Sequence, residues 1–113
     1  MDKSPVIRIW ITNKNNSEIT NEINNAMIGF LSSAMENGCD GFTFAEDTER
    51  VIVYTSWSDE RKLEKFRSSE DYKNYEKEIL NSFFAADFQL PADILFNSTA
   101  KILHTYSKNE VSS

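Results

Sequence analysis

The chain has 113 residues, with 18 acidic and 12 basic side chains and a formal net charge of −6. This length fits one domain over residues 1–113, large enough to have a core of its own. Phosphate binding needs a cluster of basic side chains, so the acidic balance argues against a nucleic-acid partner. The densest basic group, within residues 59–67, is interleaved with acidic residues and indicates a solvated helix face.

Cysteine usage and hydropathy exclude further classes of protein. Cys39 is the only cysteine and has no Cys or His partner at metal-ligand spacing, so we expect neither a disulfide framework nor a metal. The first residues lack the apolar segment of a secretory signal, and no apolar run approaches the roughly 20 residues that cross a bilayer. We therefore expect a cytoplasmic protein without a membrane partner.

The first expected element is a strand over residues 6–12, V-I-R-I-W-I-T, in which isoleucines alternate with Arg8, Trp10 and Thr12. A plainly solvated side would more often carry Lys, Glu or Ser than a tryptophan. We therefore expect both sides of this strand to be partly buried.

A long amphipathic helix follows, because apolar residues recur at three- and four-residue spacings over residues 19–34. Ser17 is its expected N-cap, and the pair at 37–38, Asn-Gly, is its expected stop. Next, the segments 41–46 and 50–57 predict an antiparallel hairpin, since the turn between them is too short for a parallel crossover.

Two short amphipathic helices are expected after the hairpin. Ser58 is the expected cap of the first, which buries Leu63 and Phe66. The S-x-x-D spacing of Ser68 and Asp71 predicts the start of the second. The apolar stripe of that second helix consists of Tyr72, Tyr75, Ile79 and Phe83.

The C-terminal part is less regular. Residues 85–97 are interrupted by Pro91 and read as an irregular apolar loop or a short turn of helix. A last strand is expected over residues 99–106. Residues 1–4 and 108–113 are expected to be frayed.

This order of elements predicts an α+β domain with the ferredoxin-like, split β-α-β arrangement, an antiparallel sheet with helices packed on one face. Strands that are apolar on both sides would leave the other face as an exposed apolar patch. Pairing two sheets face to face would bury that patch, so we expect a homodimer.

The strand end V-I-V-Y-T-S-W-S-D-E, the following helix with Phe66 and the helix start S-S-E-D-Y resemble the dimeric α/β-barrel superfamily, and within it the antibiotic-biosynthesis-monooxygenase-type domains. The resemblance covers about residues 6–106, the expected core. It implies a dimeric α/β barrel with a pocket between helices and sheet in each subunit. It also implies cofactor-independent oxidation or rearrangement of a small aromatic or polyketide-like molecule.

The haem-degrading branch of that superfamily gives a sharper comparison. Its pocket uses an Asn on the first strand, a Trp on the helix after the strand-end Trp, and a His on the next helix. Counted from Trp57, the last two positions fall on Phe66 and Glu76, and residues 8–10 include no Asn. A carboxylate is a poor substitute for a neutral imidazole as a ligand of ferrous haem. A haem-binding or haem-degrading protein is therefore the weaker alternative, and we expect no cofactor.

The resemblance makes several side chains candidates for the pocket. Arg8 could stabilise a phenolate, and His104, the only histidine, carries an imidazole, a common general base near neutral pH. Alternatively, Arg8 pairs with a carboxylate, His104 is structural, and the tryptophans are core or interface residues. The rival function is a non-catalytic small-molecule-binding or dimerisation module. The aromatic candidates for substrate binding are Trp10, Tyr54, Trp57, Phe66 and Tyr72.

Overall fold

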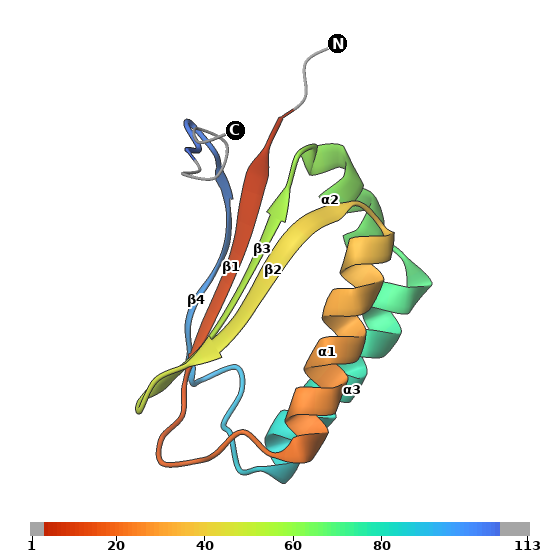
Figure 1. Cartoon of the computed structure of the whole chain (residues 1–113). Coiled ribbons are helices and arrows are strands. Elements are labelled where there is room, and N and C mark those ends of the chain that lie inside the picture. The colour runs from red at the N-terminus through yellow and green to blue at the C-terminus, as the bar shows by residue number, and fades with distance from the viewer. Residues whose placement is uncertain (1–3, 107–113) are drawn as a thin grey trace.

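The computed structural model describes residues 4–106, which form a four-stranded antiparallel sheet with three helices on one of its faces (Figure 1). The sheet order is β2-β3-β1-β4, and every neighbouring pair is antiparallel. This part of the chain is therefore an α+β domain, in an arrangement compatible with the ferredoxin-like fold. In chain order the elements are β1 (Val6–Asn13), α1 (Asn21–Glu36), β2 (Cys39–Glu46), β3 (Arg50–Trp57), α2 (Glu60–Arg67), α3 (Glu70–Ala85) and β4 (Ile94–Lys101).

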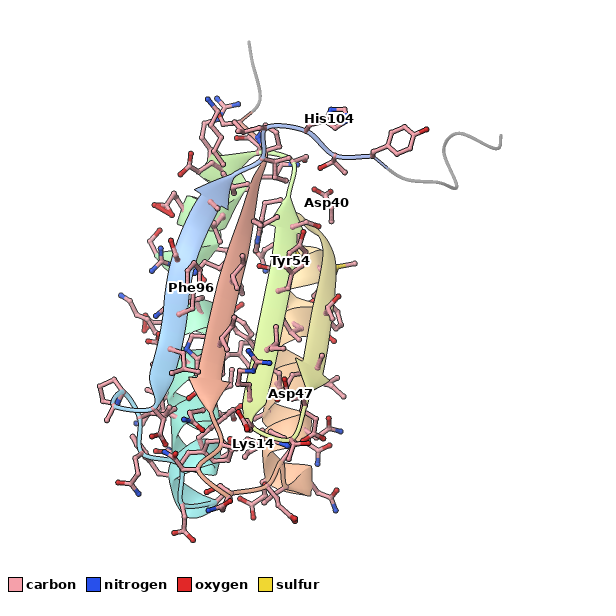
Figure 2. All side chains as sticks on the ribbon, turned by 90° about the vertical axis from the view of Figure 1, so that its left-hand side faces the viewer. Lys14, Asp40, Asp47, Tyr54, Phe96 and His104 are labelled. Carbon is pink, nitrogen blue, oxygen red and sulfur yellow. The ribbon has the colours of Figure 1, made fainter. Side chains whose placement is uncertain are left out.

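The register of the strands separates a helix-facing side of the sheet from an open side. Trp10 on β1 lies opposite Val53 on β3, which is buried beneath the helices. Ile9 lies opposite Tyr54, and because side chains alternate along a strand, this pair points to the open side seen in Figure 2. The prediction that both sides of the first strand are partly buried is confirmed, since its exposed fractions are all low or intermediate.

The N-cap of the long helix α1 lies three residues after the predicted one. Thr20, not Ser17, is the N-cap, and its Oγ1 accepts a hydrogen bond from the backbone N–H of Ile23 at 3.1 Å. Ser17 instead closes a turn, in which its N–H donates to the carbonyl oxygen of Lys14 at 2.8 Å. The predicted stop is confirmed, because Gly38 follows the helix with a φ of 110° in the left-handed region.

The caps of α2 and α3 are also shifted by one residue, and α3, with 16 residues, is as long as α1 rather than short as expected. Asp59, rather than Ser58, is the N-cap of α2, and its carboxylate accepts from the N–H of Arg61 at 3.0 Å. Ser68 is the C-cap of α2. Ser69 is therefore the N-cap of α3, and its Oγ accepts a hydrogen bond from the backbone N–H of Tyr72 at 3.1 Å. Consecutive polar residues at a helix junction offer several caps, and the backbone conformation of the bend selects one.

The prediction for the last strand was wrong in its position. β4 runs from Ile94 to Lys101 rather than over 99–106, because its partner β1 begins at Val6, which pairs with Lys101. Residues 94–97 therefore belong to the sheet rather than to a loop or helical turn. The predicted frayed ends, apart from Ser4, lie outside the described residues.

Two clusters of buried apolar side chains fill the space between sheet and helices. Trp10 packs edge to face on Phe83, a member of the first cluster, with ring centroids 5.4 Å apart. Trp57 and Phe66, 5.9 Å apart, belong to the second. The first cluster consists of Ile23, Met27, Leu31, Val51, Val53, Phe83, Phe88 and Leu90. The second consists of Val6, Ala34, Cys39, Trp57, Leu63 and Phe66.

Candidate functional site

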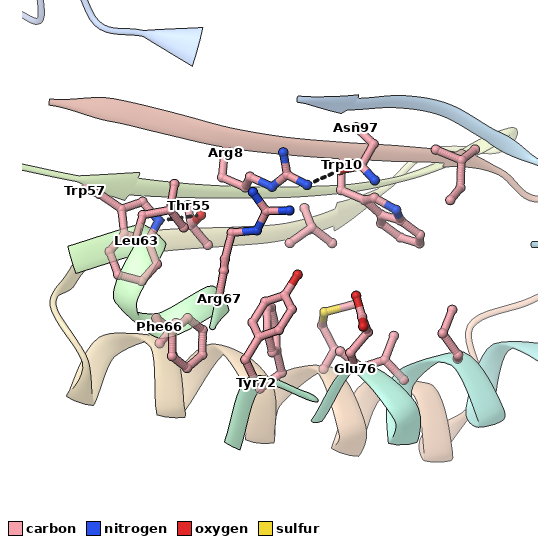
Figure 3. A pocket seen from close by; sticks show the side chains of 17 residues that line it. Arg8, Trp10, Thr55, Trp57, Leu63, Phe66, Arg67, Tyr72, Glu76 and Asn97 are labelled. Atoms are coloured by element: carbon pink, nitrogen blue, oxygen red, sulfur yellow. Dashed lines mark hydrogen bonds between the residues drawn. The ribbon is translucent and has the colours of Figure 1, made fainter. Parts of the chain in front are cut away.

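A cavity of about 220 Å³ lies between the helix-facing side of the sheet and the helices (Figure 3). Its residues come from both core clusters, so the cavity occupies the position where the two clusters meet. The sheet contributes side chains from β1, β3 and β4, and all three helices contribute to the opposite wall. The site is therefore built from segments that are far apart in the sequence.

Aromatic rings form much of the apolar wall. Phe66 packs against Trp57 and, edge to face, against Tyr72, with ring centroids 5.4 Å apart in the second pair. The indole N–H of Trp57 donates to Thr55 Oγ1 at 2.9 Å, so its one polar atom is satisfied within the wall. Trp10 forms another part of the wall. A flat apolar molecule would find ring surfaces to pack against here.

Arg8 provides the main polar group on the sheet side of the cavity. Its guanidinium donates to Thr99 Oγ1 at 3.2 Å and to Asn97 Oδ1, both on the neighbouring strand β4. Burial and, second to it, the positive charge of Arg67 lower the pKa of Arg8 from its usual value. Both acceptors of Arg8 are neutral, so its charge is not balanced by these hydrogen bonds.

Three further polar side chains lie on the helix side. Arg67, at the end of α2, lies 3.8 Å from the carboxylate of Glu64. Tyr72 and Glu76 are four residues apart on α3 and thus share one face of that helix. Figure 3 shows the Tyr72 hydroxyl and the Glu76 carboxylate pointing toward the sheet. The cavity therefore combines two arginines, one carboxylate and one phenol with an apolar wall.

The structure brings most of the predicted site residues together. The cavity is lined by Arg8 and by four of the five aromatic candidates, Trp10, Trp57, Phe66 and Tyr72. They converge because alternate residues of β1 and β3 face the helices, while Phe66 and Tyr72 occupy the sheet-facing stripes of α2 and α3.

Two predicted site residues lie elsewhere. Tyr54 is on the open side of the sheet, because it alternates with Val53 and Thr55, which face the helices (Figure 2). His104 is exposed, lies beyond the end of β4 and stacks on Tyr106 with ring centroids 6.5 Å apart. Neither lines the cavity.

Sequence reasoning missed several residues that line the cavity. Arg67 follows Leu63 by four residues on α2, so it lies at the edge of the apolar stripe, partly exposed and partly against the cavity. Glu76 likewise follows Tyr72 by four residues on α3 and lies beside the apolar stripe of that helix. Both spacings could have indicated a place beside the core. Asn97 could not have been found, because its segment was not recognised as a strand.

The residues of the cavity do not fit haem. The positions where the haem-degrading branch has Trp and His are occupied here by Phe66 and Glu76, and both line the cavity. Haem is larger than the ligands that a space of 220 Å³ accommodates. Within residues 4–106, no group of three His, Cys, Asp or Glu side chains could hold a metal ion, and no helix is long and apolar enough to cross a bilayer.

Neither a family model nor a curated protein matches the chain. The site is therefore interpreted from its own geometry and chemistry.

Proposed function

We propose that this protein is a small-molecule-binding domain of the dimeric α/β-barrel type, whose ligand is a compact aromatic molecule. The observation that supports the proposal is the composition of the cavity, with ring surfaces along its wall and a few polar groups led by Arg8. Small-molecule sites typically have this composition. A volume of about 220 Å³ lies below the roughly 300–1,000 Å³ of sites for drug-sized ligands, which favours a ligand of few fused rings.

The proposal includes a homodimer formed by the open sides of two sheets. Soluble proteins rarely leave a contiguous apolar patch of several strands in water. A two-fold pairing would cover this face with a copy of itself, since the same patch serves both subunits. The apolar and aromatic side chains of the open side are Ile7, Ile9, Ile11, Ala45, Ile52, Tyr54, Phe96 and Ala100.

A second candidate is cofactor-independent monooxygenation of the bound molecule, and Glu76 is the observation that favours it. Its carboxylate points into the cavity and could remove a proton from an activated methylene of a phenolic ligand. The resulting carbanion, held as an enolate beside Arg8, would reduce O₂ and form a hydroperoxide at that carbon. Loss of water from the hydroperoxide leaves a carbonyl, so one oxygen atom enters the product and the other enters water.

Calorimetric titration with 2-naphthol tests the binding proposal. We expect saturable binding to the wild type and its loss in Ile79→Phe, because residue 79 lines the cavity and a larger ring would fill it. Ile28→Phe is the matched control, since residue 28 is exposed on α1 and lies outside the cavity. Binding that survives in the filled variant would place the ligand elsewhere and refute the proposal.

Oxygen uptake with anthrone and 2-tetralone, which carry activated methylenes, tests the monooxygenase candidate. We expect turnover by the wild type and a loss of at least about tenfold in Glu76→Gln, the usual scale for removing a general base. Glu78→Gln, on the same helix but outside the cavity, should keep the rate. Equal rates in both variants would remove Glu76 from the mechanism, and binding without oxygen uptake would leave the non-catalytic module as the function.

A further inference from the structure

The guanidinium groups of Arg8 and Arg67 both line the cavity and lie between Trp57 and Trp10, although one comes from β1 and the other from the last turn of α2 (Figure 3). Besides burial, the positive charge of Arg67 lowers the pKa of Arg8, and the carboxylate of Glu64 opposes this effect more weakly. Like charges repel more strongly in a partly desolvated site than on an open surface. An anion between the two groups would remove this repulsion.

Neither guanidinium has a close carboxylate partner of its own within residues 4–106. Arg8 donates to a threonine hydroxyl and an asparagine carbonyl, and it forms no ion pair in this part of the chain. Arg67 has Glu64, but the separation is 3.8 Å and the Glu64 side chain is 60% exposed. Such a loose surface pair contributes little to holding either side chain. Both guanidinium groups can therefore turn donors toward a ligand.

We propose that this part of the cavity is a carboxylate subsite, and that the ligand is an aromatic acid whose carboxylate is held by Arg8 and Arg67 while its ring packs on the aromatic wall. The inference rests on the proposed function and specifies the chemical class of the ligand. The planar fork of a guanidinium matches the two oxygens of a carboxylate, which favours this anion over a monatomic one. The hydroxyl of Tyr72 adds a further donor on the helix side.

Glu76 determines the direction in which such a ligand lies. It lines the same cavity one helical turn beyond Tyr72 and would repel a second negative charge. The acid group is therefore directed toward the two arginines, and the far edge of the ring toward Glu76. This arrangement predicts that removing a positive charge from the cavity lowers its affinity for an aromatic acid, whereas removing the negative charge of Glu76 raises it.

Calorimetric titration with 2-naphthoate and its neutral isostere 2-naphthamide tests the inference. We expect the wild type to bind the acid at least about tenfold more tightly than the amide, and this preference to weaken as salt is added. Arg67→Gln and, separately, Arg8→Gln should reduce the preference to about twofold or less, and Glu76→Gln should increase affinity for the acid. Lys65→Gln, which removes the same charge from the same helix outside the cavity, should leave the preference unchanged.

Thermal unfolding of each variant separates a lost contact from a lost fold. Because Arg67 is exposed at the end of a helix, its variant is expected to fold normally even if the half-buried Arg8 variant does not. Equal affinity for acid and amide would overturn the carboxylate subsite and leave the binding proposal standing. A preference that persists in Arg67→Gln, or that Lys65→Gln removes equally, would also overturn it. Failure of both ligands and of 2-naphthol to bind would refute the binding proposal as well.

Discussion

Ile9 on β1 lies directly opposite Tyr54 on β3, in the middle of the sheet side that faces away from the helices. These two strands are the central pair of the sheet, so the two side chains occupy the middle of its apolar patch. Tyr54 is still 38% exposed. The pair is therefore the part of this face that a second subunit would cover most completely.

The proposed homodimer can be tested by placing a charge at this position. We expect Tyr54→Asp to raise the dimer dissociation constant at least about tenfold, because association would bury an unpaired carboxylate. Sedimentation velocity over a range of protein concentrations measures the change. Ile28→Asp replaces an exposed apolar residue on α1 and should leave association unchanged. A wild-type chain that is monomeric at micromolar concentration would refute the dimer.

Two neighbouring phenylalanines on α3 should differ widely in their effect on stability. Phe83 is fully buried and packs on Trp10 and, at 4.8 Å between centroids, on Phe88, so Phe83→Ala should cost about 3–5 kcal/mol of unfolding free energy. Phe84 is 49% exposed, and Phe84→Ala should cost less than about 1 kcal/mol. Urea unfolding of both variants measures the difference. Similar losses for the two would contradict the assigned orientation of α3.

Gly38 is required by both its backbone and its surroundings. Its φ is 110°, and a Cβ added there would lie 2.7 Å from Cδ of Lys62. We expect Gly38→Ala to destabilise the fold by about 1 kcal/mol or more, as for alanine forced to a positive φ. Gly41→Ala is the control, because its added Cβ would meet Ser56 Oγ at an ordinary 3.6 Å. Comparable losses in thermal stability for both variants would contradict the argument.

Acid unfolding should depend in part on Asp47, in the turn between β2 and β3. Hydrogen bonds from the Arg50 side chain, and then from nearby backbone N–H groups, lower the pKa of Asp47 from 3.8 to about 2. A carboxyl whose pKa is lower in the folded state stabilises the fold at pH values above 3.8, and this contribution is lost as the pH falls toward 2.

Comparing urea unfolding at pH 7 and pH 2.5 in the wild type and in Asp47→Asn measures this contribution. The variant should lose less stability between the two pH values. Because the side chains of Asp47 and Arg50 are both exposed, the difference in stability loss between the wild type and the variant is expected to be small. Glu49→Gln, which alters an acid of the same turn, should show the wild-type dependence. An identical pH dependence for the wild type and Asp47→Asn would contradict the prediction.

The pattern of side chains along the chain was sufficient to predict most of the fold. The alternation of side chains around Arg8 is the two-residue period of a strand, and the apolar stripe that ends near Gly38 has the 3.6-residue period of a helix. Both periods can be read from neighbouring residues in the sequence. The helix caps could not be placed from sequence, because Ser68 and Ser69 have similar capping ability and only the bend between α2 and α3 distinguishes them. β4 was misplaced because a strand's limits are set by its partner, here β1.

Some residues of the candidate site could likewise be predicted from the sequence, whereas others were placed only by the tertiary structure. Sequence alone indicated that Trp10, Trp57 and Phe66 belong on buried faces, since an aromatic residue in a periodic stripe loses contact with water wherever the element packs. Only the tertiary structure brought Arg67 to Arg8, because the approach of two charges depends on how a strand and a helix pack across the core. It also placed Tyr54 on the open side, since periodicity defines two faces of a strand without specifying which one the helices cover. His104 lies beyond the sheet because β4 ends at Lys101, where its pairing with β1 ends.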